Sequence, residues 1–468
     1  MPHSVETDTR KQEEKQHRMT TEPPEKLICQ LAAPTIVSML ITSFYNMADT
    51  FFIAKLENTS ATGAIGVAFS LMSIIQAVGF FFGHGSGNFI SRELGKKNVR
   101  GAEEMAATGF FSSFIAGLVI MIAGLAFLHP LAKFLGSTDT ILPYAVDYLR
   151  IILIGAPYMC ASLVLNNQLR FQSNAFFAMI GLTTGGILNL ALDPLFIFGL
   201  HMGVNGAALA TILSQLVSFV LLYIGVQRSD SLKIHLRNYR PNRFYLKNIV
   251  NGGTPSLCRQ GLNSVSTIVL NTVAKGYGDA AIAAISIVSR IMMFASSAVI
   301  GFGQGFQPVC GFNYGAHLYG RVKRAYLFCV KYATIFLVVL AVAVFAWSGQ
   351  IVGLFQKSDP TVIEIGTFAL RCQCVTFPLS AMVVMSNMLT QTIGKVGKAS
   401  LLAMARQGLM FIPAVVILPH FWKLTGLILA QPTADLLSFA LALPLTIGEI
   451  RLLGITEPKS NPNEGIPT

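Results

Sequence analysis

The clearest guide to the fold is the segment ILNLALDPLFIFGL, which runs from Ile187 to Leu200. It has the apolar character of a membrane span, yet it contains the amide of Asn189, the carboxylate of Asp193 and the imide ring of Pro194. A charged side chain in the middle of a bilayer costs roughly 2.5–3.5 kcal/mol even on insertion scales. Such a residue is therefore a candidate functional group wherever a membrane span retains it.

The composition of the whole chain also indicates a membrane protein. Hydrophobic residues make up 53% of the 468 residues and charged residues only 12%, with a mean hydropathy of +0.59. A helix needs about 20 apolar residues to cross the hydrocarbon of a bilayer. We predict twelve such helices, over residues 27–54, 61–86, 102–128, 141–166, 174–199, 203–227, 246–274, 279–305, 322–347, 361–386, 398–419 and 425–448.

The polar segments predict how the chain is oriented. Residues 1–26 lack the apolar core and cleavage site of a signal peptide, so we expect a disordered cytoplasmic tail. With this tail inside, the positive-inside rule is satisfied and both termini are cytoplasmic. The opposite loops carry isolated lysines, whereas the cytoplasmic loops carry most of the basic residues, including Arg92, Lys96, Lys97, Arg100, Arg170, Arg228, Arg237, Arg321 and Arg324. The net charge of +12 therefore serves orientation and needs no nucleic acid.

The two halves of the chain are related by an internal repeat of about 220 residues. Because each repeat holds an even number of spans, both halves have the same orientation and form a parallel repeat. We predict an all-α membrane protein with two six-helix lobes, at residues 27–227 and 246–450, joined by a linker at 228–245 and followed by a cytoplasmic tail at 451–468. The matching pairs include Gly83 with Gly303, Gly85 with Gly305, Gly95 with Gly315, Gly206 with Gly426, Pro34 with Pro255, Arg150 with Arg371 and Pro157 with Pro378.

Polar residues of the first lobe are expected to share one layer of the membrane. Asp49 and Asp193 each precede the outer end of their span by about six residues, which places both roughly 9 Å below that end. Tyr148 and Thr211 fall at a similar depth in spans four and six. Two further groups lie one helical turn from the acids, Tyr45 beside Asp49 and Asn189 beside Asp193.

This layer suits the binding of a cation. Low dielectric and a neighbouring carboxylate both disfavour a charged Asp, so the pair can exchange a proton. The oxygens of Asp49, Asn189, Asp193 and Thr211 equally suit Na⁺, and the sequence does not choose between the two ions. A structural interpretation is also open, in which each Asp caps a helix or holds an arginine. Pro194 removes a backbone hydrogen bond and permits a bend beside the acid, as does Pro34 in the first span.

The other polar motifs leave more than one interpretation. The second lobe carries a set of charged residues that form either structural ion pairs or a polar cavity wall: Arg259, Arg290, Arg371, Arg406 and Asp435. Glycines at 83, 85 and 87 follow no strand, so we expect close helix packing or a helix end there, and His84 is either a buried hydrogen-bonded residue or a ligand. No catalytic triad, Walker lysine or metal-ligand cluster appears in the sequence. We predict neither an enzyme nor a cofactor.

Three segments resemble the multidrug and toxic compound extrusion (MATE) transporters: GHGSGNFISRELGKKN (83–98), NLALDPLFIFGLHMGVNGAALAT (189–211) and FNYGA (312–316). The resemblance covers both six-helix halves and implies a V-shaped pair of lobes that exports amphipathic, often cationic drugs in exchange for H⁺ or Na⁺. In the archaeal and DNA-damage-inducible branches the ion site lies in the N-terminal lobe. That pattern implies coupling residues at Asp49, Tyr148, Asn189, Asp193 and Thr211, a bending proline at Pro34, and cavity residues at Tyr45 and Asn166. Another branch uses carboxylates in helices seven and ten, where this chain has Arg259, Gln260 and Arg371 instead.

These observations predict a secondary active multidrug efflux antiporter. We expect a multi-pass monomer in the plasma (inner) membrane of a bacterium or archaeon, with drug-like small molecules, a coupling cation and membrane lipids as partners and no nucleic acid. One alternative is a lipid-linked oligosaccharide flippase, in which arginines of the second lobe would grip a phosphate. Another is a membrane receptor or scaffold that transports nothing.

Overall fold

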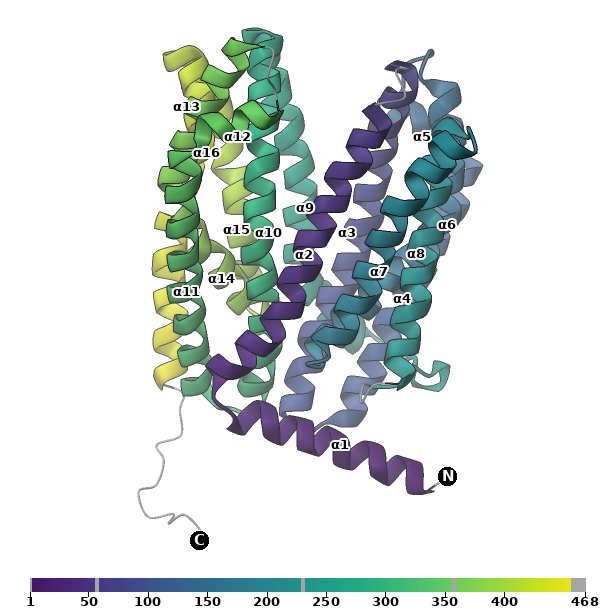
Figure 1. Ribbon diagram of the computed structural model, residues 1–468. Coiled ribbons are helices and arrows are strands. Elements are labelled where there is room, and N and C mark those ends of the chain that lie inside the picture. Colours follow the sequence, from purple (N-terminus) through teal and green to yellow (C-terminus); the bar gives the residue numbers. More distant parts are fainter. Residues whose placement is uncertain (1, 55–58, 229–231, 356–358, 456–468) are drawn as a thin grey trace.

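The computed structural model describes residues 2–54, 59–228, 232–355 and 359–455, and within them the side chains of 2–9, 11, 46–54, 59–63 and 65 are not described. In these ranges every regular element is helical. The chain begins with α1 (Pro2–Thr21) and then builds two lobes, which Figure 1 shows side by side. The prediction of an all-α membrane protein with two repeated lobes is confirmed.

The first lobe contains six long helical segments. In chain order its elements are α2 (Pro24–Ala54), α3 (Thr59–Gly95), α4 (Val99–Ala126), the short α5 (Leu128–Phe134), α6 (Leu142–Phe171), α7 (Ala175–Pro194) with its π-helical continuation η1 (Leu195–Gly199), and α8 (Gly203–Arg228). Capping residues fix some of these ends: the side chain of Asn98 accepts a hydrogen bond from the backbone N–H of Gly101 at 3.1 Å.

The second lobe repeats this order after a linker that holds the short η2 (Leu236–Asn238). Its elements are α9 (Arg243–Ala274), η3 (Lys275–Tyr277), α10 (Asp279–Gly315), α11 (Tyr319–Ala346), α12 (Ser348–Phe355), α13 (Pro360–Thr376), η4 (Phe377–Leu379), α14 (Ser380–Thr392), α15 (Val396–Met404), η5 (Ala405–Leu409) and α16 (Phe411–Ile455). A single crossing is formed by α13, η4 and α14 together. Conversely, α16 is two helices, because Trp422 and Lys423 leave helical geometry in its interior.

Ten segments of the described chain are long and apolar enough to cross a membrane. One of them, Val396–Gly454, has 59 residues and holds two crossings, since the break at Trp422 and Lys423 divides it. The remaining crossing is α9, which has a lower mean hydropathy than the other long helices of the two lobes. It packs against α3, although most of its side chains remain at least partly exposed. These segments account for the twelve predicted spans.

Backbone geometry repeats along with the helices. α3 and α10 both have 37 residues, and α4 and α11 both have 28. The turns between them adopt the same left-handed conformation, with φ of 63° at Lys97 and 61° at His317. The turns after α6 and α14 match in the same way, with φ of 63° at Ser173 and 83° at Gly394. The predicted repeat is therefore present in the conformation of the loops as well as in the order of the helices.

The lobes meet through glycines that allow backbones to touch. A Cβ added to Gly95 would lie 2.2 Å from the carbonyl oxygen of Phe312, and one added to Gly315 would lie 2.0 Å from that of Arg92. In the repeat, Arg92 corresponds to Phe312 and Gly95 to Gly315. The two contacts are therefore equivalent, with the roles of the lobes exchanged. Close approach through small residues is a common way for membrane helices to associate. The expectation of close helix packing at Gly83, Gly85 and Gly87 is also confirmed, since an added Cβ would lie 2.8 Å from Asn167, 2.4 Å from Ile249 and 2.1 Å from Phe171 respectively.

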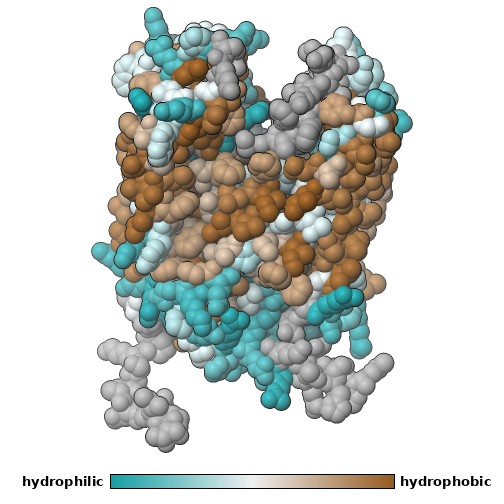
Figure 2. Space-filling view, viewed as in Figure 1, coloured by the Kyte–Doolittle hydropathy of each residue, from teal (hydrophilic) through white to brown (hydrophobic). Residues whose placement is uncertain are grey.

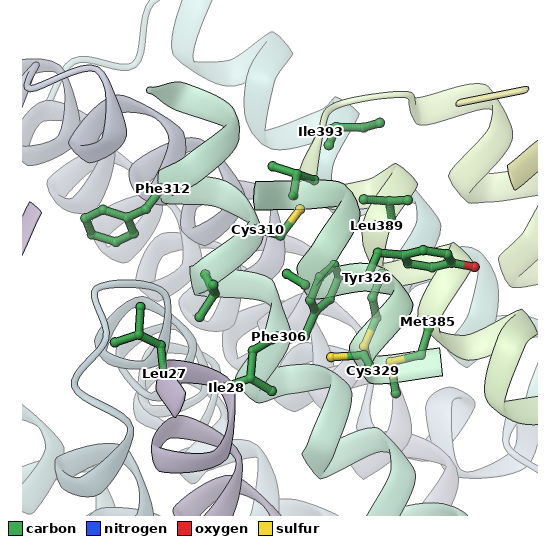
Figure 3. Packing of buried hydrophobic residues seen from close by; sticks show 14 of the residues in the cluster. Leu27, Ile28, Phe306, Cys310, Phe312, Tyr326, Cys329, Met385, Leu389 and Ile393 are labelled. Atoms are coloured by element: carbon green, nitrogen blue, oxygen red, sulfur yellow. The ribbon is translucent and has the colours of Figure 1, made fainter. Parts of the chain in front are cut away.

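The largest buried apolar cluster also joins the two lobes. Figure 3 shows Leu27 and Ile28 of α2 beside Phe306 of α10, with Tyr326 of α11 and Leu389 of α14 on the other side. The junction lies toward the end of the molecule that carries α1, which we call the α1 end. Figure 1 shows the lobes diverging from there toward the opposite end, and the outline in Figure 2 is notched between them at that end. This agrees with a V-shaped pair of lobes.

The surface has the pattern expected in a bilayer. Figure 2 shows a hydrophobic belt around the middle of the visible face and hydrophilic residues gathered at the α1 end. Large exposed apolar side chains on this scale are unusual in soluble proteins, where they signal a binding surface. They include Phe44, Phe69, Val119, Ile122, Val339, Val342, Val375 and Ile417.

The prediction of a disordered tail at residues 1–26 is wrong, because residues 2–21 form α1. This helix lies across the α1 end of the bundle and contacts both α3 and α10 (Figure 1). Its Met19 is buried, the side chain of Gln16 donates to the carbonyl of Gly95 at 3.4 Å, and Asn313 donates to the carbonyl of Met19 at 3.1 Å. Hydropathy alone could not find α1, since its sequence is polar and its order comes from these tertiary contacts.

Several helices also continue beyond their predicted ends at the α1 end. The span predicted to end at 86 continues to Gly95, and the one predicted to end at 305 continues to Gly315. The apolar pattern marks only the part of a helix that hydrocarbon would surround, while the backbone ladder extends past it. The extra turns carry the glycines that join the lobes.

Candidate ion-coupling site

Asp193 is buried inside the first lobe. Its side chain lies near the end of α7 with 1% of its surface exposed, and Asn189, one turn earlier, is 6% exposed. The Nδ2 group of Asn189 donates a hydrogen bond to Oδ1 of Asp193 at 3.2 Å. The sequence spacing of four residues therefore brings the amide and the carboxylate into contact, as it does on any α-helix.

The helix changes type directly after this pair. Pro194 has no N–H to donate, and beyond it the ladder skips to the fifth residue, with the N–H of Leu200 bonded to the carbonyl of Leu195 at 2.9 Å. On α8, Gly206 lets the backbone approach this turn, since an added Cβ would lie 2.8 Å from the carbonyl group of Phe196. π-helical turns of this kind are frequent at functional sites.

Neighbouring helices bring further predicted residues to the same lobe. Tyr45 of α2 packs on Gly186 of α7, whose added Cβ would lie 3.0 Å from the tyrosine ring. Thr211 of α8 is buried and its hydroxyl donates to the carbonyl of Ala207 at 3.0 Å. Tyr148 of α6 is 1% exposed and belongs to an apolar cluster that includes Ala207. The side chain of Asp49 lies outside the described residues, although its helix, α2, packs along α7.

The predicted cavity residue Asn166 has a helix-pairing role. Its Nδ2 group donates to the carbonyl of Ala178 at 2.9 Å, which ties α6 to α7. Asn387 occupies the matching position of the second lobe and donates to the carbonyl of Ala399 at 2.7 Å. A bond that recurs in both lobes belongs to the shared scaffold.

Pro34 lies within α2, which stays helical on both sides of it. The carbonyl of Pro34 accepts a hydrogen bond from the hydroxyl of Ser38 at 2.9 Å. The next residue, Thr35, donates across the lobe junction to the carbonyl of Gly301 at 2.7 Å. Serine and threonine hydroxyls near a proline can stabilise a membrane helix that lacks one backbone bond.

The charged residues of the second lobe do not form one cluster. Nε of Arg406 is 2.7 Å from Oδ1 of Asp435, and Gln431 donates to the same oxygen at 3.0 Å. Asp435 is buried and Arg406 is mostly buried, with side-chain exposures of 2% and 17%. Arg371 donates to the hydroxyl of Ser348 at 2.9 Å and lies over the ring of Phe345, whereas Arg290 is exposed. Of the two interpretations left open by the sequence, the ion pair holds for Arg406 with Asp435.

Sequence reasoning missed Arg170, which it assigned to a loop. The residue lies in the last turn of α6 and is only 2% exposed. Its Nη2 group donates to Oδ1 of Asn167 at 2.6 Å and lies 3.4 Å from Nε2 of His84. A charged residue at the end of an apolar segment normally indicates the start of a loop. No sequence signal therefore distinguished this buried arginine from the exposed basic residues of the loops.

Two like-oriented lobes of six helices, joined at one end and carrying a buried acid inside one lobe, define a membrane transport protein built on a parallel repeat. A protein-family model described as MatE matches residues 34–195 and again residues 255–416, once in each lobe. The chain therefore belongs to the MatE family, the multidrug and toxic compound extrusion transporters that its motifs indicated. Its assignment to a branch with aspartates in the first lobe stays a prediction.

Similar proteins cover almost the whole chain. The chain is 28% identical over 420 residues to the multidrug export protein MepA of Staphylococcus haemolyticus, covering 89% of this chain and 92% of that protein. It is 28% identical over 431 residues to MepA of Staphylococcus aureus strain MRSA252, covering 92% and 94%.

Solved structures of transporters resemble this chain over almost its whole length. One is described as the outward-facing conformation of a multidrug resistance MATE family transporter of the MOP superfamily, with a TM-score of 0.89, 26% identity and coverage of 94% of this chain and 98% of that one. Another, from Pyrococcus furiosus, has a TM-score of 0.87 and 28% identity over 93% of this chain and 98% of that one. It is described as having a binding pocket of reversed polarity that suggests a different function.

Proposed function

We propose that this protein is a secondary active multidrug efflux antiporter that exports amphipathic, often cationic compounds in exchange for H⁺ or Na⁺. The coupling ion binds in the first lobe at Asp193 and Asn189, together with Asp49, Tyr148 and Thr211. Tyr45 and Asn166 border the space used by the substrate. Pro34 and Pro194 allow the helices around the site to change shape.

The observation that carries this proposal is the burial of Asp193 beside a change of helix type. The affinity of a buried carboxylate for a cation or a proton depends on the groups around it, so it differs between two arrangements of the neighbouring helices. Because a ligand shifts an equilibrium only by its differential affinity for two states, ion binding here biases the shape of α7 and the helices packed on it. The printed names of the similar proteins, multidrug export and multidrug resistance, support the substrate class.

The orientation and location complete the proposal. By the positive-inside rule, the basic residues at the α1 end support an orientation with that end and both termini in the cytoplasm. We propose that the protein lies in the plasma membrane of a bacterial or archaeal cell as a monomer. In this orientation the diverging ends of the lobes face outward, and drug leaves from there. Labelling of a single cysteine introduced in α1 with a membrane-impermeant maleimide should require permeabilised cells.

Transport in proteoliposomes tests the coupling site. A fluorescent cationic amphiphile is loaded, and its efflux is followed under an imposed proton gradient and, separately, under an imposed sodium gradient. We expect one gradient to drive efflux in the wild type and Asp193→Asn to reduce the driven rate at least a hundredfold. Asp49→Asn should behave in the same way, and Asp193→Glu should retain part of the activity.

Asp147→Asn is the matched control, because Asp147 lies in the same lobe next to Tyr148 but is exposed. It should transport at the wild-type rate. Wild-type efflux in both Asp193→Asn and Asp49→Asn would refute the proposed site. Loss of activity in Arg259→Ala and Arg371→Ala, with both aspartate variants active, would instead favour the phosphate-gripping flippase. Absence of any gradient-driven flux would favour a receptor or scaffold.

A further inference from the structure

Two arginines from different lobes lie near the lobe junction. Arg170 comes from α6 of the first lobe, and Arg259 comes from the middle of α9 in the second lobe. α9 lies against α3, where a Cβ added to Gly85 would be 2.4 Å from the carbonyl oxygen of Ile249. Arg259 is close enough to act electrostatically on both Arg170 and His84. The three basic side chains therefore gather where α3, α6 and α9 meet.

The hydrogen-bonding capacity of this group is only partly used. Nδ1 of His84 lies 3.2 Å from the carbonyl of Phe80, so it carries the proton and leaves Nε2 to accept from Arg170. Nη2 of Arg170 donates to Asn167, but its buried Nε has no partner in the described part of the chain. Within the same ranges, Arg259 makes no hydrogen bond or ion pair. Nε of Arg170 is therefore a buried donor without an acceptor.

Negative charge is also lacking around these arginines. Among the described residues, Arg170 is 2% exposed and makes no ion pair, whereas Arg259 is only partly buried and also makes none. Buried charges in proteins are normally paired or neutralised, since an unpaired one is strongly disfavoured. Arg170 thus lacks the counter-ion that Asp435 supplies to Arg406.

The other side of the junction shows that the fold does not require these charges. Under the repeat, Arg170 corresponds to Gln391, His84 to Gln304 and Arg259 to Ser38. All three counterparts are neutral and have partners. Gln391 donates to the carbonyl of Gly252 at 2.8 Å and to the hydroxyl of Ser256 at 2.9 Å. Gln304 donates to the sulfur of Met39 at 3.7 Å, and Ser38 to the carbonyl of Pro34 at 2.9 Å. Packing alone is satisfied by neutral side chains at these positions.

We propose that Arg170, Arg259 and the surrounding donors form a binding site for a small inorganic anion at the junction of the lobes. The anion accepts from Nε of Arg170 and from the guanidinium of Arg259, and it supplies the missing negative charge. Guanidinium groups suit this role because they stay charged and offer several donors in a fixed plane. With Arg170 only 2% exposed, the headgroup of a membrane lipid is too large to reach it.

The site is linked to the arrangement of the lobes. Arg170 and Arg259 belong to different lobes, so a bridging anion favours the arrangement that holds them together, and separation of the lobes here would release it. By linkage, any ligand that stabilises the same arrangement strengthens anion binding. This inference does not depend on the transported substrate or on the coupling ion.

Thermal unfolding of the purified full-length protein in detergent, without drug, tests the proposal. Chloride and inorganic phosphate are each titrated against sodium gluconate at constant ionic strength and constant sodium. The wild type should show a saturable increase in melting temperature with at least one of the two anions. Arg170→Gln, which introduces the residue used on the other side of the junction, should weaken the apparent anion affinity at least tenfold. Arg259→Gln should do the same.

The controls separate this effect from a general response to salt. Arg371→Gln removes an arginine of the second lobe that already has Ser348 and Phe345 as partners, and its anion titration should match the wild type. In gluconate alone, Arg170→Gln should be at least as stable as the wild type, because it removes an unpaired charge. No saturable response in the wild type, or an unchanged response in Arg259→Gln, would overturn the proposal even if Arg170→Gln failed to fold.

Discussion

The two lobes share a scaffold but differ in their buried polar chemistry. The repeat makes the contact of Gly95 with Phe312 equivalent to that of Gly315 with Arg92. The interhelical hydrogen bonds of Asn166 and Asn387 are equivalent in the same way. In contrast, the buried Asp193 of the first lobe is bonded to an amide, whereas the buried Asp435 of the second lobe is bonded to Arg406. The arginine already balances the negative charge of Asp435, so that carboxylate needs no further cation.

This difference separates the residues that build the fold from those available for function. Positions that repeat are needed twice, so packing accounts for them. A polar group without a counterpart was introduced into one lobe alone and must be explained there. By this criterion we propose functional roles for Asp193 and for Arg170 with Arg259. Arg406 and Asp435 also lack charged counterparts, but they are paired with each other. Four measurements can test the comparison.

The largest effect should come from the ion pair of Arg406 and Asp435. Asp435→Leu leaves a buried guanidinium without its partner, which should lower the free energy of unfolding by about 3–5 kcal/mol. The double variant Arg406→Met with Asp435→Leu should recover most of that loss, because it removes both charges. Thermal or denaturant unfolding in detergent gives the cycle. A double variant that folds well but fails to transport would assign a functional role to this pair in addition to its structural one.

Glycines of the junction should show equal effects in the two lobes. Gly95→Ala and Gly315→Ala each place a Cβ against a backbone carbonyl, at 2.2 and 2.0 Å, and neither carbonyl can move cheaply. Overpacking of this kind costs about 1–3 kcal/mol. Gly448→Ala is the control, since a Cβ there meets nothing within 4 Å and alanine favours a helix. Strongly unequal losses for Gly95→Ala and Gly315→Ala would show that the junction is less symmetric than its contacts.

These repeats explain how much of the molecule was predictable. Apolar length and the period of about 220 residues predicted the twelve helices and two lobes, because burial in hydrocarbon leaves its pattern in the sequence. The spacing of Asn189 and Asp193 predicted their contact, because residues four apart lie on the same face of a helix. Arg170 and α1 were misassigned, since both are polar and are buried or ordered only by helices distant in the sequence. Contacts within one helix can be predicted from residue spacing alone. Contacts across the lobe junction depend on residues that are far apart in the sequence, so spacing does not predict them.

Asn166 and Asn387 should have smaller and matched effects. Replacing either with alanine removes one interhelical hydrogen bond and leaves a carbonyl, that of Ala178 or Ala399, without its donor. We expect a loss of about 1–2 kcal/mol in each case. Unfolding in detergent gives the stabilities and efflux in proteoliposomes gives the rates. If Asn166→Ala reduces efflux much more than Asn387→Ala at equal stability, Asn166 contacts the substrate in addition to pairing helices.

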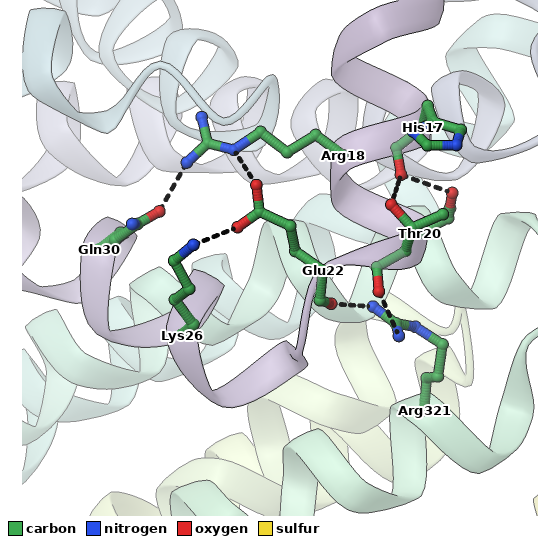
Figure 4. A network of polar contacts seen from close by, with 8 residues as sticks. His17, Arg18, Thr20, Glu22, Lys26, Gln30 and Arg321 are labelled. Atoms are coloured by element: carbon green, nitrogen blue, oxygen red, sulfur yellow. Dashed lines mark hydrogen bonds and ion pairs between the residues drawn. The ribbon is translucent and has the colours of Figure 1, made fainter.

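The smallest effect concerns how α1 is held by each lobe (Figure 4). On the side of the first lobe, the hydrogen bond from Lys26 lowers the pKa of Glu22, and the charges of Lys26 and Arg18 act in the same direction. On the side of the second lobe, Arg321 donates to the backbone carbonyls of Thr21 and Glu22, which do not titrate.

A lowered carboxyl pKa stabilises the folded state at pH values above the ordinary value of 4.5, and this contribution is lost as the pH falls through the lowered value. Hydrogen exchange in residues 12–21, corrected for intrinsic rates, should therefore increase slightly as the pH falls from 6 to below about 4. Glu22→Gln should remove that pH dependence, while Arg321→Ala should increase exchange at every pH. A strong pH dependence that persists in Glu22→Gln would mean that another titrating group holds α1, and a normal exchange rate in Arg321→Ala would mean that the first lobe alone secures it.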